Sequence, residues 1–181
     1  MLALLSLLLC GMALIRTATQ DDAGSISRVH VESWRTTYQG IVPDAFLSGL
    51  DVEERAIRWC EVLNSGVRVL VAEQEGEVVG FISGGPIREP LEEYDAELAA
   101  IYLLLDAQGK GVGTELLIEL AKRLEEDGFQ SMAVWVLEAN ASARFYERSG
   151  AVRVTAKEIE IGGALLPVAA YGWLDLKSIV R

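Results

Sequence analysis

The chain has 181 residues, of which 51% are hydrophobic and 24% charged, a composition typical of a single globular domain. Its formal charge of −11 argues against a nucleic-acid partner, because neutralising phosphates requires a basic surface. Two cysteines and one histidine are too few for a disulfide framework or for the common zinc sites, so no metal is expected.

The N-terminal segment 1–15 is apolar, but it is shorter than the roughly 20 residues of a membrane-spanning helix. It also lacks the basic start and the cleavage site of a secretory signal. Two interpretations are open: a weak export or anchor segment, or a chain that starts at Met12, with residues 1–11 an artefact of the gene start. We favour the second, because 13–17 leads directly into a helix start. It predicts one domain over 12–181, in the cytoplasm and without a membrane partner.

The pattern of apolar residues predicts a first strand at 12–17, a helix at 21–38, and shorter helices after Pro43 and at 51–63. The segments 67–73 and 77–82 are rich in β-branched residues and flank a Glu-Gly turn, which predicts a hairpin. Gly84, Gly85 and Pro86 are expected to break the second strand of this hairpin near its end.

A near-continuous apolar run at 98–105 predicts a central strand that is buried on both faces. A helix at 111–127, a buried strand at 132–137, a short helix at 141–149 and a hairpin of 152–161 with 165–174 are expected after it. This order of elements predicts an α+β fold, in which helices pack on a mixed sheet, and is too irregular for a doubly wound fold.

The most informative segment is a glycine-rich loop between a predicted strand and a predicted helix, Asp106-Ala-Gln-Gly-Lys-Gly-Val-Gly-Thr114. Glycines at a helix N-terminus expose backbone N–H groups that have no partner within the helix, and the helix dipole favours negative charge there. The loop therefore predicts a pyrophosphate site, to which Lys110 adds a positive charge.

Three kinds of phosphate-binding loop share this chemistry. The Walker loop requires Ser or Thr where this chain has Gly111, so it is excluded. The dinucleotide fingerprint nearly fits, because Gly109 and Gly111 are spaced correctly and Glu138 could bind a ribose, but Thr114 occupies the third glycine position. One short helix and a hairpin follow Glu138, rather than further strand–helix units, which disfavours this NAD-dependent alternative.

The third loop has the pattern Q-x-x-G-x-G, which Gln108, Gly111 and Gly113 match in full. Two further segments accompany it at the right distances, AELAAIYL at 96–103 and WVLEANASARFYERSG at 135–150. With these motifs the sequence resembles the GNAT superfamily of N-acetyltransferases from Met12 to its C-terminus. Leu105 and Ala107 stand where the family often has proline and an aromatic residue, but neither change removes a backbone donor.

The resemblance implies a mixed, mostly antiparallel sheet of about six to seven strands, flanked by about four helices, with a splay between the two central strands. It also implies that acetyl-CoA binds to the splayed strand, to the loop and to the helix after the loop. The expected cofactor-binding residues are Leu103, Leu104, Leu105, Gln108, Gly109, Lys110, Gly111, Val112, Gly113, Thr114, Asn140 and Tyr146. A role as helix N-cap is the alternative for Asn140.

The resemblance further implies direct transfer of an acetyl group, in a ternary complex, to a primary amine of a small molecule or of a protein N-terminus or lysine. Tyr146 matches the general acid that protonates the leaving thiolate, with packing beside Phe145 as the alternative. Glu97 stands where relatives carry the base, and a carboxyl group entering a buried strand suits that role; a solvated strand end is the alternative. Trp34 and Tyr38 are expected to line the acceptor site, unless they belong to the core.

Two alternatives to an acetyltransferase stay open, an NAD-dependent oxidoreductase and a CoA-binding regulatory module without turnover. The single histidine, His30, is expected to be structural. The resemblance also implies a possible homodimer, since partner subunits are common among relatives. The edge strand of the C-terminal hairpin offers a contact for it.

Overall fold

The computed structural model describes residues 13–180 of the chain. The apolar segment 1–11, and with it the expectation of a start at Met12, lies outside the described residues. Within 13–180 no helix combines the length and the apolar character needed to cross a membrane.

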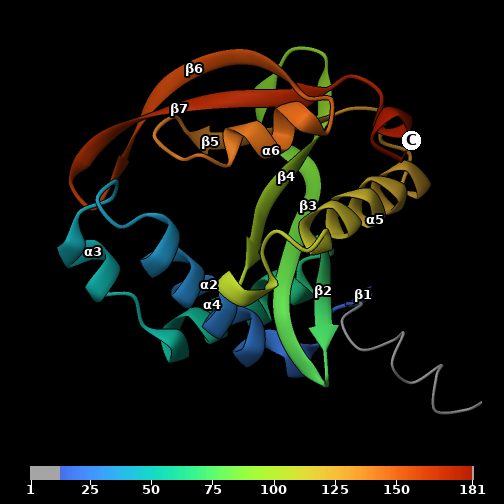
Figure 1. Cartoon of the computed structure of the whole chain (residues 1–181). Coiled ribbons are helices and arrows are strands. Elements are labelled where there is room, and N and C mark those ends of the chain that lie inside the picture. Colours follow the sequence, from blue (N-terminus) through green and yellow to red (C-terminus); the bar gives the residue numbers. More distant parts are fainter. Residues whose placement is uncertain (1–12, 181) are drawn as a thin grey trace, which may run out of the picture.

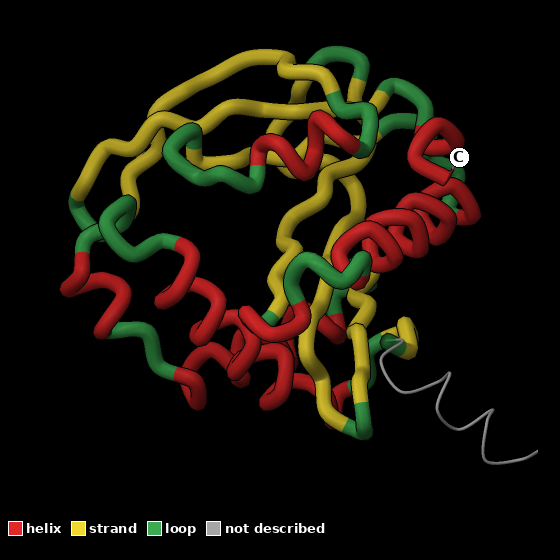
Figure 2. The backbone as a smooth tube through the Cα atoms, in the orientation of Figure 1, coloured by secondary structure: helices red, strands yellow, loops and turns green. Residues whose placement is uncertain are grey.

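In residues 13–180 the centre of the fold is a seven-stranded sheet (Figures 1 and 2). Its strands lie in the order β1-β2-β3-β4-β5-β7-β6, and every neighbouring pair is antiparallel except β4 with β5. The strands are β1 (Leu14–Thr17), β2 (Arg68–Gln74), β3 (Glu77–Leu91), β4 (Tyr94–Leu103), β5 (Met132–Leu137), β6 (Val152–Ile161) and β7 (Ala164–Trp173). The predicted α+β fold with a mixed, mostly antiparallel sheet is confirmed.

Five α-helices accompany the sheet within the described residues (Figure 1). They are α2 (Ala23–Thr37), α3 (Asp44–Ser48), α4 (Val52–Asn64), α5 (Val112–Glu126) and α6 (Ala143–Arg148). Three short 3-10 helices join them, η1 (Gln20–Asp22), η2 (Leu105–Ala107) and η3 (Leu176–Val180). The predicted helices are therefore present, although α6 is shorter at both ends than its pattern indicated.

Strand alternation divides the core between the two faces of the sheet, because successive side chains point to opposite sides. On β2, Leu70 and Ala72 pack in the cluster that contains the apolar face of α5, whereas Val69 and Val71 pack in the cluster formed with α2 and α4. α5 therefore covers one face of this half of the sheet, and α2 and α4 cover the other.

The predicted break of β3 at Gly84–Pro86 is wrong. β3 continues to Leu91 and β4 already begins at Tyr94, so the two strands form a long hairpin with register shifts after Ser83 and after Pro86. Gly84 permits a close approach rather than ending the strand, because a Cβ atom there would lie 2.7 Å from the carbonyl oxygen of Glu97.

The predicted burial of 98–105 on both faces is also wrong. β4 ends at Leu103, and Leu105 lies in η2 with 67% of its surface exposed. After Leu98 the rest of the strand is only partly buried, because β4 has by then separated from β5.

β4 and β5 pair in parallel at two positions, Ala96 with Met132 and Glu97 with Ala133. The carboxylate of Asp95 fixes this end of the pair by accepting hydrogen bonds from the backbone N–H groups of Gln130 and Ser131, both at 2.9 Å. Burial acts to raise the pKa of Asp95, but these hydrogen bonds outweigh it and lower that pKa.

The register between β4 and β3 then skips Ala99, since Ser83 pairs with Ala100 and Gly84 with Leu98. An extra residue of this kind bends its strand and can end regular pairing. Beyond Ala133, β5 continues to pair with β7 while β4 follows β3. The splay between the two central strands that the sequence implied is therefore confirmed.

Candidate active site

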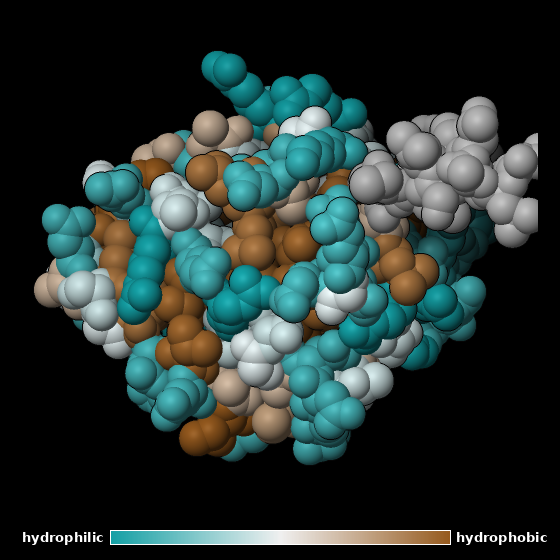
Figure 3. All heavy atoms as spheres, turned by 60° about the horizontal axis from the view of Figure 1, so that its bottom comes forward, coloured by the Kyte–Doolittle hydropathy of each residue, from teal (hydrophilic) through white to brown (hydrophobic). Residues whose placement is uncertain are grey.

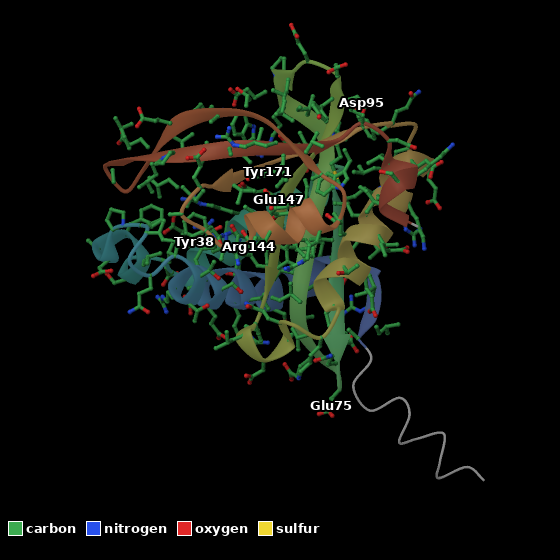
Figure 4. The ribbon with its side chains drawn as sticks, turned by 45° about the horizontal axis from the view of Figure 1, so that its top comes forward. Tyr38, Glu75, Asp95, Arg144, Glu147 and Tyr171 are labelled. Carbon is green, nitrogen blue, oxygen red and sulfur yellow. The ribbon has the colours of Figure 1, made fainter. Side chains whose placement is uncertain are left out.

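A cavity of about 640 Å³ lies in the splay between β4 and β5. Residues from the end of α2, β4, the glycine-rich loop, β5 and α6 line it. The sequence-predicted site residues that it brings together are Tyr38, Leu103, Leu105, Gln108, Gly109, Asn140 and Tyr146. Figure 4 labels Tyr38 at the end of α2 and Arg144 on α6, the two helices that contribute residues to this cavity.

The glycine-rich loop forms one rim of this cavity through Gln108 and Gly109. Gly109 and Gly111 have φ angles of +73° and +87°, which favour glycine, and α5 begins directly after them at Val112. The first N–H groups of α5 have no acceptor within the helix. The loop therefore places a helix N-terminus, with its partial positive charge, beside the cavity.

Other residues predicted to bind the cofactor do not line the cavity: Leu104, Lys110, Gly111, Val112, Gly113 and Thr114. Leu104 packs on the α2 and α4 side of the sheet, because alternation along β4 turns it away from Leu103. Val112 is buried in the core under α5, so it has only its backbone N–H to offer a ligand.

The carbonyl oxygen of Leu103 ties three parts of the site together. It accepts hydrogen bonds from Ser33 Oγ on α2 and from Gln108 Nε2 on the loop, both at 3.0 Å. The end of β4 is thus fixed to α2 on one side and to the phosphate-binding loop on the other. Ser33 also lines the cavity, and the sequence patterns had not indicated it.

Tyr146 lies on α6 with 5% of its surface exposed. Its ring packs against Phe145, Tyr171 and Trp173, with centroid distances of 5.2, 6.5 and 6.1 Å. Burial raises the pKa of Tyr146 well above the ordinary value of 10, and the nearby Tyr38 adds to the effect. The phenol is therefore protonated at neutral pH, as a proton donor must be.

Two further tyrosines form a polar pair near the end of α2. The hydroxyl groups of Tyr38 and Tyr102 lie 3.3 Å apart, and burial raises both pKa values. Trp34 packs on Tyr38 with centroids 4.8 Å apart, but it does not line the cavity, so its place is in the core cluster beside the site. Tyr102 lines the cavity and was missed as a site residue.

Asn140 lines the cavity, but it is not the N-cap of α6. The N-cap is Ser142, and Asn140 Oδ1 accepts a hydrogen bond from the backbone N–H of Ser142 at 2.9 Å. Ser142 itself makes no side-chain capping bond, whereas the bond from Asn140 to the N–H group two residues on is the contact that an N-cap side chain makes. Asn140 therefore caps the turn that leads into α6, and the helix begins two residues later than the sequence indicated.

Glu97 lines a second cavity of about 480 Å³, between β3 and β4 on one side and α2 and α4 on the other. It is 9% exposed and forms an ion pair with Arg88, whose backbone N–H also approaches the carboxylate at 3.4 Å. The guanidinium of Arg88 therefore holds the carboxylate in place at the wall of this cavity. Ala99 and Ala100 line both cavities, so the two meet at β4.

His30 also lines the second cavity and supports its wall. Its Nδ1 accepts a hydrogen bond of 3.2 Å from Trp59 Nε1, and its ring stacks on Tyr102 with centroids 4.9 Å apart. Burial, together with the positive charge of Arg55, lowers the pKa of His30 to about 3. The ring is neutral at physiological pH and connects α2 and α4 to the sheet.

The second cavity opens on the side of the molecule where α2 and α4 lie. Figure 3 shows the molecule with the lower part of Figure 1 brought forward, where polar and charged side chains surround patches of apolar ones. Arg55, Arg58 and Arg88 line this cavity, and none of them was predicted as a site residue. Arg55 and Arg58 share one face of α4 with Trp59 and Val62. A charged residue within such an apolar stripe is the sequence signal that could have marked the two arginines as site residues.

A model of the acetyltransferase (GNAT) family matches residues 25–151. The chain is 42% identical over 168 residues to the uncharacterized N-acetyltransferase YuaI of Bacillus subtilis, over 93% of this chain and 96% of that protein. It is 30% identical to the L-amino acid N-acyltransferase MnaT of Escherichia coli, over 70% of this chain and 71% of that one. The fold is similar to that of YncA from Salmonella typhimurium, whose structure contains its cofactor acetyl-CoA, with a TM-score of 0.70, 22% identity and 91% and 94% of the two chains covered.

The buried neutral state of His30 predicts a loss of stability in mild acid. The unfolded chain takes up this proton near pH 6.5, whereas the folded protein does so only near pH 3. The contribution of His30 is therefore complete above pH 6.5 and declines as the pH falls, by about 2 kcal/mol between pH 7 and pH 5. Urea unfolding at pH 7, 6 and 5 measures this loss.

The control is His30→Gln, which retains an acceptor for Trp59 but does not titrate. Its free energy of unfolding should depend on pH much less over the same window, in which Asp22 and Asp95 stay ionised because their pKa values are lowered. Equal slopes for the two proteins would contradict the assignment.

Proposed function

Because the chain belongs to the GNAT family and is an N-acetyltransferase, we propose that acetyl-CoA binds in the cavity between β4 and β5 and gives its acetyl group directly to a primary amine. The observation that carries this proposal is the cavity that opens where the parallel pairing of β4 and β5 ends, with a helix N-terminus at its rim and a buried phenol in its wall. YncA was solved with acetyl-CoA and MnaT is named for an amino-acid acceptor, which supports acetyl-CoA as cofactor and a small molecule as acceptor.

In this proposal the pyrophosphate of acetyl-CoA lies at the start of α5. The backbone N–H groups of Gly111, Val112 and Gly113 supply hydrogen bonds, and Lys110 adds a solvated positive charge. The pantetheine arm follows β4 into the splay. Backbone groups of β4 that face β5 have lost their strand partner there, and the amides of the pantetheine arm can satisfy them.

The chemistry requires a neutral amine and a proton for the departing sulfur. Glu97 takes one proton from the acceptor's ammonium group. The amine nitrogen then attacks the thioester carbonyl carbon, so that a C–N bond forms and the C–S bond breaks. The Tyr146 phenol gives its proton to the leaving thiolate, and the second proton released by the nitrogen restores the phenol.

A homodimer stays a proposal, supported by the exposed Val152 and Val154 on the edge strand β6. A cytoplasmic location also stays a proposal, because the segment on which that expectation depends lies outside the described residues.

Thermal unfolding with saturating ligand tests the cofactor. Acetyl-CoA at 100 times its dissociation constant should stabilise the protein by about 2.7 kcal/mol, which is a measurable rise in midpoint, and NAD should have no effect. Stabilisation by NAD alone would overturn the proposal. Stabilisation by acetyl-CoA without release of CoA on addition of amines would instead identify a regulatory module.

Tyr146→Phe should lower kcat by about 10²-fold or more and leave the affinity for acetyl-CoA unchanged, because the ring packing is kept and only the proton donor is lost. Steady-state kinetics and calorimetric titration of acetyl-CoA measure the two quantities. Tyr171→Phe is the matched control, since Tyr171 of β7 (Figure 4) loses the same hydroxyl. Its ring stacks on that of Tyr146 with centroids 6.5 Å apart. Unchanged turnover in Tyr146→Phe would exclude the assignment.

Glu97→Gln should lower kcat/KM by about 10²-fold or more at neutral pH, because the amide cannot accept the proton. Its pH–rate profile should lose the acidic limb that the parent enzyme shows. Measuring kcat/KM from pH 5 to pH 9 for both proteins decides the matter, and a profile that keeps its shape would remove Glu97 from the mechanism.

A further inference from the structure

The second cavity carries a charge opposite to that of the whole protein. Arg55 and Arg58 from α4 and Arg88 from β3 line it, and Glu97 is the one carboxylate among its lining residues in the described part of the chain. His30 in the same wall is neutral, because burial lowers its pKa to about 3. A chain with a formal charge of −11 therefore gathers three guanidinium groups around one cavity. Such a concentration favours an anionic ligand.

The three arginines differ in how far their charge is already neutralised. Arg88 forms an ion pair with Glu97, and Arg58 forms one with Glu54 at 2.6 Å. Both Arg58 and Glu54 are exposed, so that pair is weak and leaves the guanidinium free to exchange partners. Arg55 is half-buried and has no ion-pair partner among residues 13–180.

Desolvation, and then the like charge of Arg58, lower the pKa of Arg55, and the interactions with Tyr102 and Glu54 offset this only in part. Both effects disfavour the charged guanidinium, and an anion bound between the two arginines would offset them. Among residues 13–180 the nearby Glu54 forms its ion pair with Arg58, so Arg55 has no carboxylate paired with it.

A charged side chain at position 55 is also unexpected from the packing of α4 alone. Arg55, Arg58, Trp59 and Val62 lie at spacings of three, four and seven residues, so they share one face of α4. On that face Trp59 is buried and packs on Phe81 with ring centroids 4.9 Å apart. A packing role alone would favour apolar side chains at the other positions of the stripe.

The same cavity contains the proposed base and reaches the proposed cofactor site. Glu97 lines it, and Ala99 and Ala100 line both this cavity and the one in the splay. These two small residues leave room for an acceptor to approach the thioester beside β4. A volume of about 480 Å³ lies in the range of small-molecule sites.

We propose that the amine acceptor also carries a carboxylate, and that Arg55, assisted by Arg58, binds this carboxylate while Glu97 takes the proton from the amine. The acceptor class is then small amino carboxylic acids, of which α-amino acids are the simplest. A guanidinium matches a carboxylate with two parallel hydrogen bonds, which fixes the orientation of the acceptor as well as its charge. This inference rests on the proposed acetyl transfer and specifies the acceptor of that same site.

The test compares free L-amino acids with the matching L-amino acid amides, which keep the amine and the side chain but lack the carboxylate. With saturating acetyl-CoA, release of CoA gives kcat/KM for each pair. The wild-type protein should prefer the best free acid over its amide by 100-fold or more. Arg55→Gln should lower kcat/KM for that acid at least tenfold, mainly through KM, and leave the amide unchanged, so the preference collapses. Arg55→Lys should recover part of it, because the charge returns without the planar fork.

The control is Arg153→Gln, which removes the same charge from a half-exposed ion pair with Glu138 and lines neither cavity. It should keep the preference of the wild-type protein. If Arg55→Gln does not fold, as judged by thermal unfolding, Arg55→Lys and the wild-type ratio decide.

Two results would overturn the inference and leave acetyl transfer standing: amides acetylated as well as the free acids, or turnover of other amines with none of either series. Absence of both stabilisation by acetyl-CoA and turnover would overturn the proposed function, and the inference with it.

Discussion

The separation of β4 from β5 is the constraint on which the site depends. Asp95 holds the two strands together at their beginning, and parallel pairing stops after Glu97 and Ala133. A sheet buried between helices has no room for a ligand, and the backbone groups of a regular parallel pair are already satisfied. Opening the pair provides both a cavity and free hydrogen-bonding groups in its wall. The bulge at Ala99, permitted by the close approach at Gly84, is where this begins.

The same separation distributes the chemical groups to two sides of one strand. Tyr146 reaches the splay from α6, while Glu97 faces the cavity under α2 and α4. Their environments differ accordingly: burial keeps the phenol protonated, and the carboxylate is paired with Arg88. In the proposed mechanism the proton donor and the proton acceptor therefore belong to two different cavities that meet at β4. The strand between them carries alanines where the two cavities meet.

The face formed by α2 and α4 combines a rigid wall with a charged opening. His30, Trp59 and Tyr102 form a neutral, hydrogen-bonded and stacked layer against the sheet. The arginines of α4 and β3 lie at the edge of this layer. A cation beside an apolar wall is only partly hydrated, so its interaction with an anion is stronger than it would be in open solvent. This contrast is the reason that a negatively charged protein can offer a positive site at one place.

The sequence by itself determined the order of the elements, two of the three hairpins, the glycine-rich loop and the start of α5, because these depend on local periodicity and on backbone angles that glycine alone adopts easily. It misjudged Gly84 as a strand breaker, because the role of Gly84 depends on the Glu97 carbonyl that lies opposite. It also placed the start of α6 directly after Asn140, two residues too early. Only the tertiary structure decided which side chains share a cavity. Arg55 and Arg88 are 33 positions apart and Glu97 lies on a third element, so no local pattern could place them together.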